Sequence, residues 1–164
     1  MLSAAGSQGT IKAEEVTDQQ RLKELDAYWA EVSRCVASGD FEGYANTCHP
    51  EGVLVSGKKK TSYLLTEALK GWKEGIEKTR TGEIKAGVVF RFSQRWGNET
   101  TAHETGIFHY HSIDEEGKRT DAYVHLVALL LKTDKGWKVL MENQQSPATK
   151  AEWDSLKEAG TIGK

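Results

Sequence analysis

The chain has 164 residues, the size of one domain that can bury a core without disulfides or a structural metal. Hydrophobic residues make up 38% and charged residues 28%, which is a globular composition rather than a disordered or fibrous one. The formal net charge of −2 argues against a dedicated nucleic-acid binder, because such proteins carry a basic surplus. No apolar stretch approaches the roughly 20 residues that span a bilayer, and no signal peptide is visible. We therefore predict a cytoplasmic protein with no membrane or nucleic-acid partner.

The first half of the chain has a helical pattern. Residues 1–16 are small and polar and are predicted to form a flexible tail. Apolar residues then recur at intervals of three and four over 17–39, which predicts a long amphipathic helix. Asp40 can cap a short second helix. A short strand at 53–55 and a third helix at 61–78 follow.

The second half changes to the alternation that is typical of half-buried strands. Four strands are predicted, joined by turns, at 84–96, 101–113, 122–132 and 137–145. Helices followed by an antiparallel meander indicate an α+β fold. We divide the chain into the tail at 1–16, a folded domain at 17–146, and a C-terminal helix and tail at 147–164.

Several segments resemble nuclear-transport-factor-2-like domains, a superfamily that includes SnoaL-like and ketosteroid-isomerase-like proteins. The segments at 38–41 (SGDF) and 49–55 (HPEGVLV) resemble the opening of such domains. The segments at 102–108 (AHETGIF) and 136–139 (GWKV) resemble their third and last long strands. This resemblance, over residues 20–146, implies a strongly curved, mostly antiparallel sheet around the first helix. It also implies a cone-shaped α+β barrel with a pocket at its open end, frequently in a homodimer packed through its sheets.

The catalytic residues of the best-known relatives are missing at the matching positions. The resemblance places the tyrosine of ketosteroid isomerases at Val32 and their general-base aspartate at Ser56. Their second acid would lie within Val124–Leu131, which has no carboxylate. The helical aspartate of scytalone dehydratase falls on Ala37. The resemblance therefore implies a domain that binds a small apolar or carbonyl-containing ligand without ketosteroid isomerase chemistry.

The alternation in the first long hairpin predicts a polar cluster on the pocket face of the sheet. If a two-residue turn lies near Asn98, even-numbered residues before it share a face with odd-numbered residues after it. The candidate catalytic residues on this face are His109, His125, Tyr123 and Asp121. The candidate ligand-binding residues, from this face and from the helices, are Tyr28, Trp29, Tyr44, Trp72, Phe90, Phe92, His103 and His111.

This cluster leaves three interpretations open. In a pocket, a histidine can exchange a proton near neutral pH, Asp121 can orient it, and Tyr123 can donate a hydrogen bond to a substrate. Those groups would suffice for a cofactor-independent lyase or isomerase, as the alternative to a non-catalytic binding module. The histidines can instead lie at a dimer interface, or His109, His111 and His125 can ligate a metal. We expect no cofactor and no metal.

Overall fold

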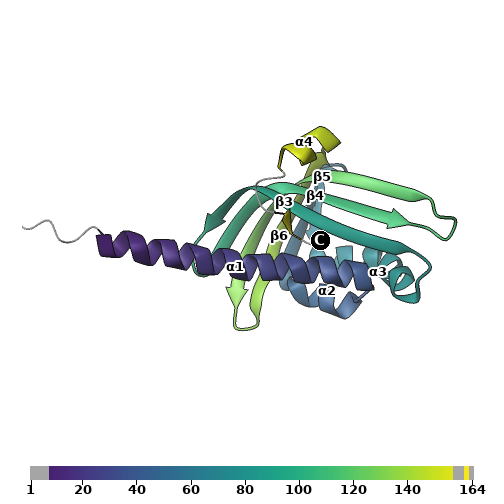
Figure 1. Cartoon of the computed structure of the whole chain (residues 1–164). Helices are drawn as coiled ribbons and strands as arrows, with labels where there is room; N and C mark the ends of the chain where they lie inside the picture. Colours follow the sequence, from purple (N-terminus) through teal and green to yellow (C-terminus); the bar gives the residue numbers. More distant parts are fainter. Residues whose placement is uncertain (1–7, 157–160, 163–164) are drawn as a thin grey trace, which may run out of the picture.

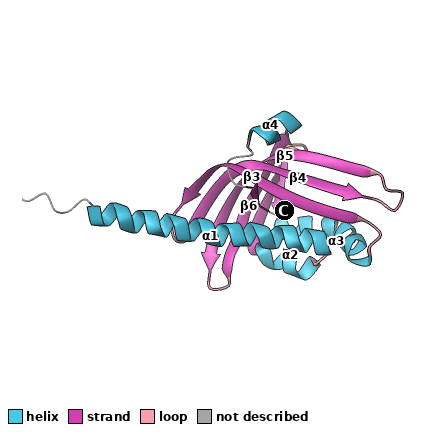
Figure 2. Cartoon of the chain, in the orientation of Figure 1, coloured by secondary structure: helices cyan, strands magenta, loops and turns pink. Residues whose placement is uncertain are grey.

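The computed structural model describes residues 8–156 and 161–162 and shows a curled sheet with a long helix lying along one face (Figure 1). Helices α1, α2 and α3 lie on that face, whereas α4 lies on the other (Figure 2). The elements in chain order are α1 (Gln8–Ser38), α2 (Phe41–Thr47), β1 (Cys48–Ser56), β2 (Thr61–Leu64), α3 (Leu65–Thr81), β3 (Lys85–Gly97), β4 (Thr101–Ile113), β5 (Arg119–Thr133), β6 (Gly136–Pro147), α4 (Lys150–Ser155) and β7 (Thr161–Ile162).

The strands form one sheet in the order β2-β1-β6-β5-β4-β3-β7. Strands β1 and β6 pair in parallel, and the other neighbours pair antiparallel. The parallel pair arises because the chain crosses from β1 through α3 and the β3–β5 meander before it returns beside β1. The predicted α+β fold with a curved, mostly antiparallel sheet is confirmed.

Helix α1 packs its apolar stripe against the inner face of the sheet. Leu25, Trp29 and Val32 are buried on this stripe, and the ring centroid of Trp29 lies 4.5 Å from that of Phe90 in β3. The helix begins at Gln8 rather than at the predicted Thr17, and residues 1–7 of the predicted tail lie outside the described residues. Within the described ranges, no helix is both long and apolar enough to cross a membrane.

A buried ion pair also joins α1 to the β3–β4 hairpin. Glu104 of β4 is fully buried, and its carboxylate accepts hydrogen bonds from the indole of Trp29 and from Arg95 Nε, the latter at 2.5 Å. Arg95 also lies 2.5 Å from the carboxylate of Asp26 on α1. The charge of the buried carboxylate is thus compensated at the helix–sheet contact.

A β-bulge in β3 determines which side chains face the inside of the sheet. Trp96 lies opposite His103, as the even–odd pairing predicts, but Phe90 lies opposite Phe108. The register shifts by one residue at Ser93, which has no partner in β4. Side chains alternate between the two faces of a sheet, so one extra residue changes which residues share a face. Along most of the hairpin, even-numbered residues of β3 therefore share a face with even-numbered residues of β4.

Gly106 accommodates the bulge from the opposite strand. A Cβ atom at this position would lie 2.1 Å from the carbonyl oxygen of Arg91 and 2.9 Å from the Cα atom of Phe92. Only glycine allows the two backbones to approach this closely.

Candidate functional site

A cavity of about 500 Å³ lies between the three N-terminal helices and the inner face of the sheet. This volume is in the range of small-molecule sites, which are concave and mainly apolar. Most of its wall is apolar or aromatic. The aromatic lining residues are Tyr28, Trp29, Tyr44, Trp72, Phe90, Phe108 and Tyr110.

Two glycines in α3 leave open space beside the cavity. Gly71 and Gly75 are one helical turn apart, both line the cavity and both are exposed. A Cβ atom at either position would meet nothing within 4 Å. Glycine inside a helix costs about 1 kcal/mol relative to alanine, so α3 gives up intrinsic stability where it borders the open space.

Among the described residues, one carboxyl group lines this cavity, that of Glu142 in β6. Its Oε1 atom accepts a hydrogen bond of 2.7 Å from the amide of Gln144, which also lines the cavity. Burial raises the pKa of Glu142 above its usual value, and the hydrogen bond from Gln144 only partly offsets this effect. Among the lining residues that the structure describes there is no lysine, arginine or histidine.

Glu142 faces inward because β6 also contains a bulge. Val139 pairs with Leu130 and Met141 with Leu129, so Leu140 has no partner in β5. Val139 lines the cavity, and strict alternation would then turn Glu142 outward. The extra residue reverses the alternation and turns Glu142 into the cavity instead.

The tyrosines of the two N-terminal helices supply further polar groups. The hydroxyl of Tyr28 donates a hydrogen bond of 3.1 Å to the carbonyl oxygen of Thr47. The ring of Tyr44 packs edge-on against Trp72, with centroids 6.0 Å apart. Burial raises the pKa of Tyr28 and of Tyr44 well above 10, so both hydroxyls stay protonated at neutral pH.

The structure divides the predicted site residues between the two faces of the sheet. The predicted ligand-binding residues that line the cavity are Tyr28, Trp29, Tyr44, Trp72 and Phe90. Phe92 does not line it and packs in the core, with its ring centroid 5.3 Å from that of Trp29. The remaining six belong to the outer face: His103, His109, His111, Asp121, Tyr123 and His125. The prediction that they share the pocket is wrong, because the bulge at Ser93 reverses the face of β4 and β5 relative to Phe90.

Helix α4 covers part of this outer face. The rings of His109 and Tyr123 are stacked with centroids 4.3 Å apart. The ring centroid of Trp153 in α4 lies 5.7 Å from that of His109. The guanidinium of Arg91 lies 4.0 Å from the centre of the Trp153 ring and donates a hydrogen bond of 2.8 Å to its carbonyl. Two predicted catalytic residues therefore pack beneath a helix, away from the cavity.

The outer-face histidines pair with carboxylates. His109 Nε2 lies 2.6 Å from Asp121, which also binds Arg119 at 2.9 Å. Hydrogen bonds from Arg119 and His109 lower the pKa of Asp121 to about 2. His125 Nε2 lies 3.3 Å from Glu152 of α4. Among the residues that the structure describes, no histidine joins two further His, Cys, Asp or Glu side chains closely enough to hold a metal ion.

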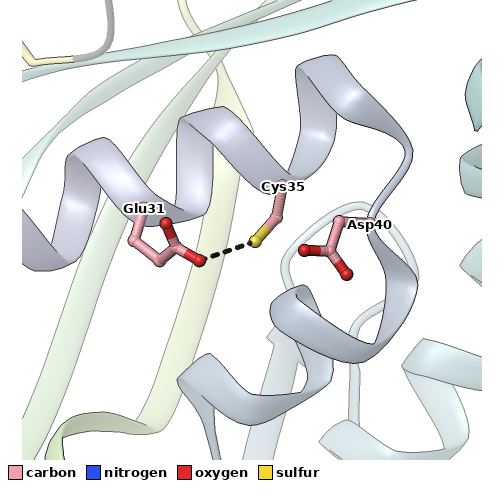
Figure 3. Close-up of side chains that lie close together, drawn as sticks. All are labelled: Glu31, Cys35 and Asp40. Carbon is pink, nitrogen blue, oxygen red and sulfur yellow. Dashed lines mark hydrogen bonds between the residues drawn. The ribbon is translucent and has the colours of Figure 1, made fainter.

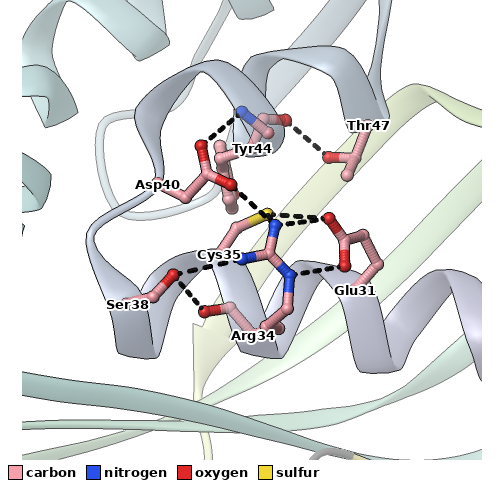
Figure 4. Close-up of polar contacts among 8 residues, drawn as sticks. Glu31, Arg34, Cys35, Ser38, Asp40, Tyr44 and Thr47 are labelled. Atoms are coloured by element: carbon pink, nitrogen blue, oxygen red, sulfur yellow. Dashed lines mark hydrogen bonds and ion pairs between the residues drawn. The ribbon is translucent and has the colours of Figure 1, made fainter.

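A different group brings three ligand-type atoms together where α1 meets α2. Glu31, Cys35 and Asp40 place these atoms within 4.8 Å of one another (Figure 3). The guanidinium of Arg34 lies among them and donates hydrogen bonds of 2.6 Å to each carboxylate (Figure 4). Asp40 also caps α2 by accepting a hydrogen bond of 2.8 Å from the Gly43 amide. Arg34 neutralises both carboxylates, so this group is a helix-capping network and not a metal site.

Sequence reasoning missed the polar centre of the cavity. Glu142 and Gln144 are not among the candidates, and neither are the lining aromatic residues Phe108 and Tyr110. A glycine inside a predicted strand, such as Gly106, is a signal for a bulge, and it indicates where the alternation of β3 and β4 breaks. No comparable signal marks Leu140.

Comparison with known proteins identifies the fold. The chain matches no protein-family model and no curated protein sequence. It is similar to the structure of a nuclear-transport-factor-2-like protein with a cystatin-like fold from Novosphingobium aromaticivorans. The TM-score is 0.65 at 12% identity, over 94% of this chain and 99% of that one.

Two other solved structures are similar. A nuclear-transport-factor-2-like protein from Salmonella enterica has a TM-score of 0.55 at 11% identity, over 82% of this chain and 94% of that one. ActVI-ORFA from Streptomyces coelicolor has a TM-score of 0.58 at 12% identity, over 76% of this chain and 95% of that one. At identities this low, the structural similarity shows a shared fold and nothing more. What the site does depends on its own residues.

Proposed function

We propose that this chain, which has the cone fold of nuclear-transport-factor-2-like proteins, binds a small, largely apolar organic molecule in the cavity between its helices and sheet. The observation that carries the proposal is the cavity of about 500 Å³ with aromatic walls and one carboxyl–carboxamide pair. Apolar walls supply affinity by excluding water, and a few polar groups determine how the ligand is oriented. The comparisons support this proposal at the level of the fold.

Filling the cavity tests this function. Val124 lines the cavity from β5, and Val124→Phe places a ring in the space that the ligand would occupy. Val127→Phe is the matched control. Val127 lies on the same strand but on the other face of the sheet, and it does not line the cavity. Binding of a panel of bicyclic alcohols and ketones can be followed through the fluorescence of Trp29 and Trp72, which line the cavity.

We expect Val124→Phe to weaken binding about tenfold or more and Val127→Phe to leave it within about twofold. Equal affinities in the two variants, or no binding by the wild-type chain, would contradict the proposal.

A second candidate function is a cofactor-independent lyase or isomerase. The observation that favours it is Glu142, a half-buried carboxyl with a raised pKa that lines the same cavity as Tyr28 and Tyr44. A carboxyl with a raised pKa keeps its proton to higher pH than an exposed one and can pass it to a substrate, while a tyrosine donates a hydrogen bond to the substrate carbonyl. Glu142 takes the role first assigned to the histidines, which lie on the other face.

The test of this candidate separates binding from turnover. We expect Glu142→Gln to retain ligand binding and to lose at least about a hundredfold in the rate of double-bond migration in a β,γ-unsaturated ketone. The conjugated product is followed by its absorbance. Turnover that survives in the Gln variant would exclude Glu142 as the proton-transfer group.

We also propose a homodimer that packs through the outer face of the sheet. Trp96 is 63% exposed there, and its ring stacks on that of His103 with centroids 6.3 Å apart. Sedimentation analysis of Trp96→Glu tests the pairing, which should shift to monomer if this face is the interface.

The cytoplasmic location and the division of the chain into tail, cone and terminal segment stay predictions.

A further inference from the structure

The cavity holds an acidic group without a basic partner among the described residues that line it. Glu142 is the one carboxyl among the described residues that line it, and within that set no lysine, arginine or histidine accompanies it. Its hydrogen-bond partner is the neutral amide of Gln144. Elsewhere in the structure buried or half-buried carboxylates have cationic partners, as Glu104 has Arg95 and Glu24 has Lys132.

An ionised carboxylate removed from water is costly unless a cation compensates it. Glu104 shows that this fold can supply such a cation from a neighbouring strand. No lining side chain in the described part of the chain does the same for Glu142, so a bound ligand can supply the positive charge. A ligand carboxylate or phosphate in the same place would meet repulsion, with no basic group to balance it.

The aromatic walls suit the same kind of ligand. Tyr28 and Trp29 form a perpendicular pair with centroids 5.0 Å apart and an interplanar angle of 81°. Tyr44 and Trp72 form a second such pair, at 6.0 Å and 85°. Rings set at right angles can present their electron-rich faces to a rounded cation from two directions, as in sites that bind quaternary ammonium groups.

We propose that the cavity binds organic cations, with an ammonium group directed at Glu142 and its alkyl substituents against the rings of Tyr28, Trp29, Tyr44 and Trp72. This inference rests on the ligand-binding function proposed above and names the class of ligand. It excludes anionic ligands and ranks neutral ligands of the same shape below cations.

Three probes of nearly equal shape test the inference on the full chain. Benzyltrimethylammonium carries a positive charge, neopentylbenzene is its neutral isostere, and phenylmethanesulfonate is an anion of similar size. Their affinities are measured through tryptophan fluorescence. We expect the cation to bind about tenfold or more tightly than the neutral isostere, and the anion to bind weakest.

Two variants assign the preference to the carboxyl group. Glu142→Gln keeps the shape and removes the charge, so the cation and the neutral isostere should then bind within about twofold of each other. Glu152→Gln, in α4 on the outer face, is the matched control and should keep the wild-type preference. Circular dichroism checks that both variants are folded. If Glu142→Gln does not fold, the order of the three probes' affinities for the wild-type chain decides whether the cavity prefers cations.

The pH dependence gives a second readout, because a quaternary ammonium group does not titrate. The cation should bind more tightly as pH rises and Glu142 loses its proton, while the affinity of the neutral isostere should change little. The other titratable groups among the described lining residues stay protonated between about pH 4 and pH 8. Burial raises the pKa of Tyr28 and Tyr44 well above 10, that of Tyr110 above 10 and that of Cys48 to about 11.

The outcomes separate this inference from the function on which it rests. A neutral isostere that binds as tightly as the cation overturns the inference and supports a cavity for neutral ligands. Failure of all three probes also overturns it, and the comparison of Val124→Phe with Val127→Phe then decides independently whether the cavity binds ligands. A cation preference that persists in Glu142→Gln would show that the charge is recognised elsewhere.

Discussion

At the scale of single residues, the buried carboxylate of Glu104 is expected to contribute strongly to stability. Glu104→Ala removes a fully buried carboxylate that binds Trp29 and Arg95, and it leaves the half-buried Arg95 with Asp26 alone. Breaking a buried pair on one side costs about 3–5 kcal/mol. We expect a loss of this size in urea unfolding, against less than about 1 kcal/mol for Arg80→Ala at the exposed pair with Glu77. Similar losses in both variants would contradict this assignment.

Glu142 should make stability depend on pH in an unusual direction. Its folded-state pKa lies above the unfolded value, so the folded chain holds this proton more tightly than the unfolded chain does. The resulting stabilisation is complete below the unfolded pKa near 4.5 and is lost as pH rises through the folded pKa. Relative to Glu142→Gln, the wild-type chain should therefore lose stability from about pH 4 upward. Urea unfolding across this range measures the difference.

Glu152→Gln is a control of opposite sign for that measurement. Hydrogen bonds from the backbone and side chain of Thr149 lower the pKa of Glu152. Its contribution is therefore present above the unfolded pKa and lost as pH falls through the folded pKa. If Glu142→Gln and Glu152→Gln shift the pH profile in the same direction, the placement of Glu142 in an apolar cavity is wrong.

At the scale of elements, the bulge in β3 determines which residues reach the cavity. Deleting Ser93 would let β3 pair regularly with β4, and it would turn one end of the strand to the wrong face. We expect the deletion to cost at least about 4 kcal/mol or to prevent folding. Ser93→Ala keeps the extra residue and should cost less than about 1 kcal/mol, because this exposed hydroxyl donates a single hydrogen bond of 3.2 Å to Thr105. Thermal unfolding followed by circular dichroism compares the two.

How much could be predicted from the sequence differs between helices and strands for a physical reason. The helical stripe over 17–39 predicts where Tyr28 and Trp29 point, because the 3.6-residue period runs unbroken through α1. The face of His109 instead depends on counting residues from the turn near Asn98, and one unpaired residue at Ser93 changes every face beyond it. An alternation counted through β6 would likewise turn Glu142 outward, because it does not include the unpaired Leu140. The existence and order of the strands do not depend on this count, so the fold was predicted while the polar part of the site was not.

At the scale of the whole molecule, the cavity is space that the fold leaves unpacked. Gly71→Ala in α3 tests what this space costs, since its Cβ would meet nothing within 4 Å and alanine favours a helix by about 1 kcal/mol over glycine. We expect Gly71→Ala to raise the free energy of unfolding by about 0.5–1 kcal/mol in urea titrations. Ligand affinity should stay nearly unchanged, since one methyl group occupies little of a cavity this size. A loss of stability would indicate that the glycine is required for the geometry of α3.

Two of the unpaired residues, Ser93 and Leu140, also affect how related chains should be compared. Ser93 and Leu140 behave as single-residue insertions, and a relative that lacks either of them matches this chain only when a gap is opened there. An ungapped alignment would place His109 against pocket positions and Glu142 against surface positions. A comparison of which positions vary among relatives would then attribute the constraints on buried residues to exposed positions, and the reverse.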